Sequence, residues 1–474
     1  MNLVPFFLKL IDKRHKLRLK LISALKAIDI MKITFYNSLT NSLEEFKPIH
    51  EGKVSMYVCG PTVYNYPHIG NMRPVVVFDT LRRFLTYVGY DVTYVSNFTD
   101  VDDKIIKESQ KEGKSEKELT DFYIEQFKKV TREIGSNIPT VTPRVTEYIQ
   151  KIIDYIDNLV KIGAAYVIDG DVYFRVSKIK EYGSLSGIIV EDLIAGARVE
   201  ENSKKESPLD FALWKTTNVG INWDSPWGKG RPGWHTECCV MIDTIFNEEI
   251  DIHGGGYDLK FPHHENEIAQ TIATHNHKIA HYWMHNAFIN FGDQKMSKSL
   301  GNVIYAKDMI AQYGGPVTRL VILSAHYRQP VNFTEDTVKA ATQEINKMQM
   351  AYKQMALKLQ TNNVDLKEGK PLYIDGFINS LADDLNTANA LAELYNVLKE
   401  ANQQVRTKEP DLVKLNNLFK TLTDMFHVLG LDIHYVEMNE KDKKLYSDYL
   451  QSKVEQNYEK SDEIRKILIE KGIM

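Results

Sequence analysis

An α/β domain with an open parallel sheet, interrupted by an insertion and followed by an all-α domain, is the fold that this 474-residue sequence predicts. A Val- and Tyr-rich run ending at Val58, an amphipathic stretch over 73–88 and a second β-like run over 92–95 follow one another closely. This strand–helix–strand order is typical of a parallel, nucleotide-binding α/β unit. The rhythm is lost over 148–224, and β-like runs disappear after residue 335, where Leu, Met, Ala and Lys dominate.

The composition is that of an ordinary globular protein, with 43% hydrophobic and 26% charged residues. The formal net charge of -4 gives no overall signal for nucleic acid, so any RNA contact must come from local basic patches. No run reaches the roughly 18 apolar residues of a membrane span, and we expect no membrane association. The low, odd number of cysteines argues against a disulfide framework and predicts a reducing, cytoplasmic compartment.

Residues 1–30 differ from the rest of the chain because they are rich in Lys and Arg, with apolar residues at helical spacing. They contain no small-residue cleavage site after a clear apolar core, so a secretory signal is not expected. Met31 is followed directly by the strand-like run 33–36. We therefore interpret 1–30 as a basic extension before the first domain, with a basic amphipathic surface helix as the alternative.

The first strand-to-helix connection holds the earliest candidate site. Cys59 ends the strand, and His68 and Gly70 lie just before the expected helix. That helix is predicted from Arg73 onward, with Pro74 in its first turn, where a missing N–H costs nothing. An open parallel sheet binds ligands at this edge, and a helix N-terminus favours phosphate. No dinucleotide-binding glycine fingerprint and no P-loop is present, and a core Cys with a capping His is the structural alternative.

The middle of the chain predicts first an insertion and then a return to the sheet. Within 148–224, Asp169-Gly170 is a good hairpin turn between two short β-like runs. The Pro- and Gly-rich stretch 223–233 is expected to form a loop, and Trp234 then opens a helix. A strand over 250–252 leads into consecutive glycines that would let a ligand approach the backbone, a loose turn being the alternative. These glycines are Gly254, Gly255 and Gly256.

A candidate metal site can be assembled from residue types alone. His263 and Glu267 are four residues apart on a predicted helix and therefore share one face. Cys59 and either Cys238 or Cys239 could add two thiolates. Two sulfur ligands, one imidazole and one carboxylate suit a single zinc ion, which has no redox chemistry and accepts S, N and O ligands together. The residue chemistry does not distinguish Cys238 from Cys239, and two buried thiols beside a capped helix are the alternative without metal.

Several ordered motifs resemble those of the class I cysteinyl-tRNA synthetases. Residues 68–71, His-Ile-Gly-Asn, resemble the family's HIGH signature with Asn where many members have His, and 295–299 reads Lys-Met-Ser-Lys-Ser, the full KMSKS signature. Residues 57–64 and 233–238 resemble the family's two cysteine-bearing motifs, and 261–267 resembles its third metal motif. The resemblance implies that Cys239 is no ligand and that the zinc ligands are Cys59, Cys238, His263 and Glu267.

The resemblance implies a two-step reaction. L-Cysteine and ATP, the latter with Mg²⁺, give cysteinyl-adenylate and pyrophosphate, and the adenylate then acylates the 3′ end of tRNA(Cys). Zinc coordination of the substrate thiolate would reject serine, so no proofreading domain is expected. Asn71 can donate a hydrogen bond to a phosphate but carries no charge, so the phosphate clamp leans on His68 and the lysines.

The resemblance also implies roles for individual residues. Trp234 is one of the expected substrate contacts, and the alternative for it is ordinary packing in the protein core. The catalytic residues are expected to be His68, Asn71, Lys295 and Lys298. The expected ATP contacts are His68, Gly70, Gly254, Gly255, Gly256, Asp258 and Lys298. The expected substrate contacts are Cys59, Thr62, Thr99 and Trp234.

The resemblance covers the chain from about residue 31 to residue 470 and predicts a monomer. The expected domains are the extension 1–30, two halves of a Rossmann-like catalytic domain at 31–147 and 225–302, a connective insertion at 148–224, a stem-contact linker at 303–334 and a helical tRNA- and anticodon-binding domain at 335–474. One alternative is a cysteine ligase acting on an amino-sugar acceptor, which would lack the long helical region. Another is a non-catalytic zinc- or RNA-binding relative, which should have lost His68 or Lys298.

Overall fold

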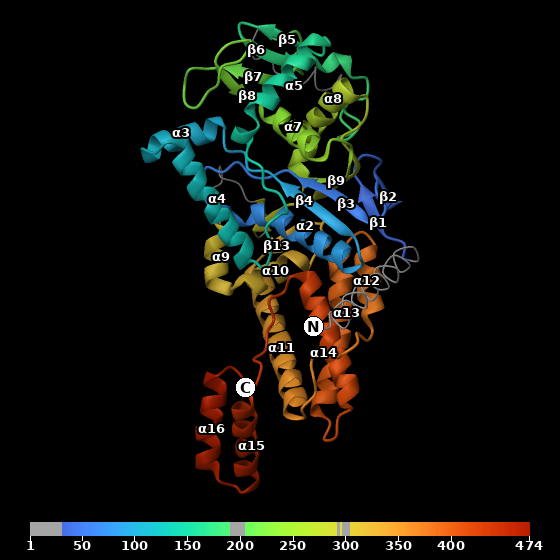
Figure 1. Ribbon diagram of the computed structural model, residues 1–474, viewed down its shortest axis with the longest axis vertical. Coiled ribbons are helices and arrows are strands. Elements are labelled where there is room, and N and C mark those ends of the chain that lie inside the picture. The colour runs from blue at the N-terminus through green and yellow to red at the C-terminus, as the bar shows by residue number, and fades with distance from the viewer. Residues whose placement is uncertain (1–30, 190–203, 292–293, 296–303) are drawn as a thin grey trace, which may run out of the picture.

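A parallel sheet forms the centre of the protein (Figure 1), seen in a computed structural model that describes residues 31–189, 204–291, 294–295 and 304–474. The strand order is β10–β9–β3–β4, and each neighbouring pair is parallel. The strands are β3 (Lys53–Val58), β4 (Asp91–Ser96), β9 (Ile250–Gly256) and β10 (Ala280–Asn286). The predicted parallel α/β architecture is therefore confirmed. The predicted extension 1–30 lies outside the described residues.

Helix α2 (Ile69–Tyr87) connects β3 to β4 and begins at Ile69 instead of the predicted Arg73. The early start arises because Asn71 Oδ1 accepts a hydrogen bond of 3.0 Å from the backbone N–H of His68, which closes the first turn. Pro74 consequently lies inside the helix, so its predicted place in the first turn was wrong. The earlier start puts His68 and Asn71 at the N-terminus of a helix that packs on the sheet.

An antiparallel sheet, at the top of Figure 1, separates the two halves of the parallel sheet in the sequence. Its order is β5–β6–β7–β8, with strands β5 (Ala165–Ile168), β6 (Asp171–Phe174), β7 (Phe211–Thr216) and β8 (Gly230–Pro232). Asp169 and Gly170 have φ values of 52° and 88°, as the predicted hairpin turn requires. The stretch 223–233 was predicted to be a loop, but its residues 230–232 form the strand β8, which pairs with β7. Glycine at position 230 permits this close pairing, because a Cβ there would be 2.3 Å from the Lys215 carbonyl oxygen.

Helices and short strands surround the parallel sheet. Helices α7 (Trp234–Phe246) and α8 (Glu265–His275) lie between it and the antiparallel sheet in Figure 1. The helix α5 (Ile149–Lys161) and the short helical segments η3 (Tyr257–Leu259) and η4 (Lys260–His264) also belong to this part of the chain. Further helices are α3 (Asp103–Glu112), α4 (Glu116–Glu133), α9 (Ala306–Tyr313) and α10 (Gly315–Leu323). The short elements are β1 (Thr34–Asn37), β2 (Ser42–Glu45), η1 (Val145–Glu147), η2 (Val176–Lys178), β11 (Ile289–Phe291), β12 (Gln294–Lys295) and β13 (Val331–Phe333).

Residues 335–474, all of which the structure describes, contain helices and no strand, as predicted. The helices are α11 (Glu335–Thr361), α12 (Ile374–Ala382), α13 (Thr387–Arg406), α14 (Leu412–Leu429), α15 (Glu440–Val454) and α16 (Tyr458–Glu470). Buried apolar side chains of α11–α14 continue the hydrophobic core around α2. None of the described helices combines the length and the apolar character needed to cross a membrane.

A buried ion cluster joins α2 to the helical region. Asp79 of α2 has no exposed surface, and its Oδ2 accepts hydrogen bonds from Arg319 Nη2 of α10 at 2.9 Å and from Arg83 Nε at 2.8 Å. Arg319 also donates to the Leu429 carbonyl oxygen at the end of α14, and Arg83 donates to that of His427. The cluster therefore holds α2 in one position relative to α10 and α14.

Candidate active site

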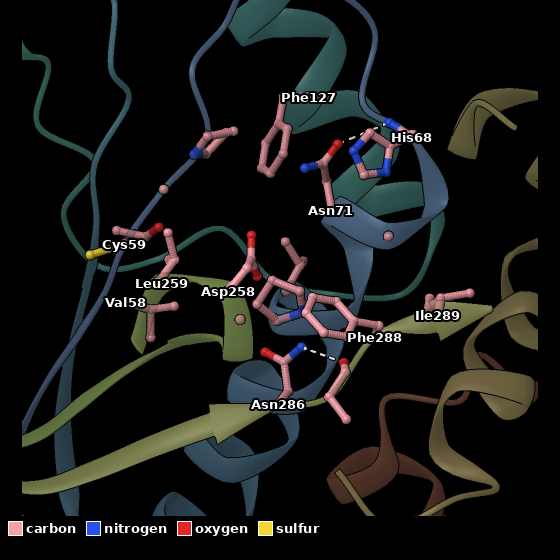
Figure 2. A pocket seen from close by; sticks show the side chains of 18 of the residues that line it. Val58, Cys59, His68, Asn71, Phe127, Asp258, Leu259, Asn286, Phe288 and Ile289 are labelled. Atoms are coloured by element: carbon pink, nitrogen blue, oxygen red, sulfur yellow. Dashed lines mark hydrogen bonds between the residues drawn. The ribbon is translucent and has the colours of Figure 1, made fainter. Parts of the chain in front are cut away.

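A cavity of about 330 Å³ opens where β3 and β9 end beside the N-terminus of α2 (Figure 2). Cys59 lines it from the end of β3, Asp258 from the turn after β9, and Asn286 from the end of β10. Carboxyl ends of parallel strands are the usual ligand-binding edge of such sheets, and the volume suits a small-molecule site.

The N-terminus of α2 forms one wall of this cavity. His68, Gly70 and Asn71 all line it. Because Asn71 Oδ1 accepts from the His68 backbone, its amide nitrogen is directed toward the cavity, as Figure 2 shows. The first turn of α2 contains no acidic residue that would offset the positive end of the helix dipole. The wall is therefore suited to bind an anion such as a phosphate.

The predicted nucleotide contacts at the end of β9 divide into two sets. Gly256 and Asp258 line the cavity. Gly254 and Gly255 are not among the lining residues, because β9 continues through them and buries both. A Cβ on Gly254 would lie 2.3 Å from the ring of Phe78 in α2, so glycine there serves close helix–strand packing. The glycine-rich loop predicted after residue 253 is thus largely strand.

Other lining residues were not singled out from the sequence. Asn286 and Phe288 lie at and just beyond the end of β10, and Phe127 comes from α4 (Figure 2). Asn286 could have been found by asking which polar side chain ends the neighbouring parallel strand. Phe127 has no such signal, because an aromatic residue on an amphipathic helix reads as ordinary core.

Four side chains that could hold a metal ion meet beside this cavity. Their ligand atoms all lie within 4.8 Å of one another. We call them the donor group: Cys59, Cys238, His263 and Glu267. Cys59 belongs both to this group and to the cavity lining. The group is therefore continuous with the cavity.

Distances within the donor group are short. Cys59 Sγ lies 3.5 Å from both Cys238 Sγ and Glu267 Oε1. His263 Nε2 lies 2.9 Å from Glu267 Oε1, as their predicted common face requires, and 3.8 Å from Cys238 Sγ. Cys239 Sγ instead lies 3.7 Å from the backbone carbonyl of Glu267. The structure thus brings Cys238 into the group and leaves Cys239 outside it.

The electrostatics of the donor group favour the ionised, negatively charged forms of two of its side chains. Burial opposes ionisation of Glu267, but His253 and His263 outweigh it and hold the pKa of this carboxyl well below its usual value. A hydrogen bond with Cys59 lowers the pKa of Cys238 to about 6, whereas burial raises that of Cys59. One carboxylate and one thiolate are thus favoured near neutral pH, and a cation would release the remaining protons.

His253, which sequence reasoning missed, orients the carboxylate of Glu267. Its Nε2 lies 2.7 Å from Glu267 Oε2, while Glu267 Oε1 faces the other donors. Such an outer partner fixes ligand geometry in metal sites. A second group, Cys59, His253, His264 and Glu267, meets the same distance limit but offers only one sulfur. Zinc favours sites with more thiolate, so the donor group fits it better.

The remaining predicted residues differ in their surroundings. Trp234 is 41% exposed and stacks on His263 with ring centroids 4.1 Å apart, so it covers the donor group and is not a core residue. Thr62 and Thr99 form a β-bridge but do not line the cavity. The backbone of Lys295 pairs with Asn290 in β11, and Lys298 lies outside the described residues.

Comparisons with known proteins agree on one family. Residues 45–343 match the family model for the tRNA synthetases class I (C) catalytic domain, and residues 376–434 match the DALR domain. The cysteine–tRNA ligase of Halalkalibacterium halodurans is 44% identical over 94% of this chain and 97% of its own length. That of Acholeplasma laidlawii is 44% identical over 93% of this chain and 100% of its own length.

Solved structures of low sequence identity share the fold. Mycobacterium tuberculosis methionyl-tRNA synthetase in complex with methionyl-adenylate superimposes with a TM-score of 0.58 at 14% identity. The match covers 80% of this chain and 89% of that one.

Proposed function

This chain belongs to the class I cysteinyl-tRNA synthetases, the cysteine–tRNA ligases, and we propose that a zinc ion held by its donor group selects cysteine over serine. One observation carries the proposal: Cys59 lines the cavity and also lies 3.5 Å from Cys238 and Glu267 in the donor group. A substrate in the cavity would therefore have its side chain within reach of the metal.

The donor group fits zinc in ligand type and in spacing. It offers two sulfurs, one imidazole and one carboxylate, and Glu267 is held anionic by its two histidine neighbours. Bound zinc would coordinate the substrate thiol as a thiolate. Cys59 and Cys238 give the site soft donors, which favour a thiol over the hydroxyl of serine.

The activation step needs positioning and charge stabilisation more than a protein nucleophile, because the carboxylate of cysteine attacks the α-phosphate of ATP itself. We assign the phosphates to the N-terminus of α2, where His68 and Asn71 line the cavity. Gly256 and Asp258 line the cavity after β9 and are assigned to the nucleoside. Mg²⁺ would accompany ATP, bound mainly by its phosphates.

The proposal extends to two further parts of the chain. Lys295 and Lys298 are assigned to the phosphates, where they would act as charge builds in the transition state. The helical region that includes the DALR-matching residues 376–434 is assigned to tRNA(Cys). The lysine assignment rests on family membership and on the position of the cavity at the helix terminus, and the tRNA assignment rests on family membership.

ATP–pyrophosphate exchange with cysteine and with serine tests the metal's part in selectivity. Untreated protein is expected to prefer cysteine by about 10⁴ or more, as sites built around one polar contact do. After chelation the preference should fall to about 10² or less, because shape alone separates a thiol from a hydroxyl poorly. Added zinc should restore it. Full activity and selectivity of metal-free protein would refute the proposal.

Removal of the His68 imidazole is expected to slow activation without unfolding the protein. His68→Ala should lower kcat of pyrophosphate exchange about 10²–10³-fold, the usual cost of losing one donor to developing charge. Steady-state exchange kinetics would measure it. The control is His50→Ala, because the His50 side chain is exposed, pairs with Glu248 and does not line the cavity. Equal kcat for both variants would remove His68 from the phosphate site.

A further inference from the structure

A buried chain of polar side chains lies behind the two cysteines of the donor group. Asn97 and Thr99 follow β4, and Glu237 precedes Cys238 in α7. Each of the three is only 1% exposed. None lines the cavity, and none belongs to the donor group. We call Asn97, Thr99 and Glu237 the relay.

One end of the relay holds the backbone that follows Cys59. Asn97 Oδ1 accepts a hydrogen bond of 2.8 Å from the backbone N–H of Gly60. The two segments are in such close contact that a Cβ on Gly60 would lie 1.6 Å from the Asn97 carbonyl oxygen. The Thr99 N–H donates to the Pro61 carbonyl at 3.1 Å. The position of Cys59 is therefore tied to the segment after β4.

The other end of the relay holds the helix that carries Cys238. Thr99 Oγ1 donates a hydrogen bond of 2.9 Å to Glu237 Oε2 and accepts one of 3.4 Å from Asn97 Nδ2. Cys238 Sγ lies 4.0 Å from Asn97 Oδ1. Hydrogen bonds thus run without a break from Gly60, next to Cys59, to Glu237, next to Cys238.

Burying a carboxyl group and an amide costs free energy unless their hydrogen bonds are satisfied. Apolar side chains could fill this space at lower cost, as replacements of buried polar groups show. Apolar packing, however, would not fix the orientation of these side chains. Each hydrogen bond of the relay does fix the orientation of its two partners. The relay links two chain segments whose cysteine sulfurs lie 3.5 Å apart: Cys59 directly follows β3, and Cys238 lies in α7.

We propose that Asn97, Thr99 and Glu237 are positioning residues that set the separation of the two donor-group sulfurs and thereby the affinity of the site for its metal. The inference rests on the proposed zinc site. It assigns the relay to the metal and not to the substrate, so its effect should be measurable without cysteine or ATP.

The test is the zinc affinity of relay variants, measured by competition with a chromophoric chelator. Glu237→Ala removes the acceptor of Thr99 and should weaken zinc binding about 10–100-fold, as loss of outer partners does in metal sites. Glu237→Gln keeps an oxygen that can accept the same hydrogen bond and should bind zinc nearly as the original chain does. Thr99→Val keeps the side-chain volume, removes the hydroxyl and should behave like Glu237→Ala.

A second readout separates positioning from stability. In the Co²⁺-loaded protein, the thiolate-to-cobalt absorption should change in Glu237→Ala and Thr99→Val but not in Glu237→Gln. The matched control is Asp251→Asn: Asp251 is a buried carboxylate that accepts from Ser55 N–H at 2.7 Å, outside the donor group. It should lower stability and leave both metal readouts unchanged.

Each remaining outcome has one meaning. Unchanged zinc affinity and cobalt spectrum in Glu237→Ala or Thr99→Val would overturn the relay, and so would equal losses in Glu237→Ala and Glu237→Gln. If Glu237→Ala does not fold, Thr99→Val decides by the same comparison. Failure of the unaltered chain to bind zinc would instead refute the proposed metal site.

Discussion

Cys238→Ala is expected to abolish tight zinc binding and to reduce the preference for cysteine over serine from about 10⁴ to about 10² or less. The reason is geometric, since Cys238 Sγ lies 3.5 Å from Cys59 Sγ and 3.8 Å from His263 Nε2. Its loss leaves the donor group with a single sulfur, which weakens the preference for a soft metal and a thiol substrate. Metal content and pyrophosphate exchange with both amino acids would measure the change.

Cys239→Ala is the matched control for this experiment. The two cysteines are neighbours in α7 and are 2% and 1% exposed, so their removal creates similar cavities. Burial raises the pKa of Cys239, and its sulfur lies 3.7 Å from the backbone carbonyl oxygens of His235 and Glu267, away from the other ligand atoms of the donor group. We expect full zinc content and unchanged selectivity. Loss of zinc from Cys239→Ala alone would mean that the donor group is wrongly assembled.

The choice between these cysteines shows where sequence reasoning from residue chemistry ends. Two adjacent thiols in a predicted helix differ only in direction, because each step along a helix turns the side chain by roughly 100°. Their direction depends on how α7 packs against β3 and α8, and residue types carry no information on that packing. Resemblance to a family selected Cys238, and the geometry independently brings it to Cys59.

Local patterns predicted the parallel sheet and the helical region well, because hydrophobic periodicity reports directly on local structure. They failed where pairing with a distant segment decides the conformation. The strand β8 exists because Gly230 fits against Lys215 of β7, and α2 starts early because Asn71 closes its first turn. The contact between His253 and Glu267 depends on how β9 and α8 are placed relative to each other, which the spacing of residues in the sequence also does not reveal.

The glycine run shows how one pattern can serve two purposes. Backbone approach to a ligand and close packing of a helix both require the absence of a Cβ. Gly256 lines the cavity, whereas Gly254 is needed because Phe78 of α2 lies against it. The same packing fixes the position of α2, and therefore of His68 and Asn71, relative to the parallel sheet. The phosphate-binding end of α2 thus depends on contacts made along the whole helix.

Asp79 makes one of these contacts, and Asp79→Asn is expected to lower the free energy of unfolding by about 3–5 kcal/mol, the usual cost of breaking a buried ion pair. The carboxylate is fully buried and faces Arg319, Arg83 and Arg82, which would lose their common partner. Urea denaturation would measure the loss. The control is Glu344→Gln, whose ion pair with Lys347 is partly exposed and should contribute less than about 1 kcal/mol.

The pH dependence provides a second test of the same residue. Burial opposes ionisation of Asp79, but Arg319, Arg83 and Arg82 outweigh it and lower its pKa in the folded protein. A carboxyl with a lower pKa when folded stabilises the protein above its unfolded pKa of about 4 and loses that contribution as pH falls further. The stability difference between the original chain and Asp79→Asn should therefore be constant near neutral pH and narrow below about pH 4. A difference that widens in acid would mean that the pKa of Asp79 is higher in the folded than in the unfolded protein and that the three arginines do not hold this carboxyl ionised.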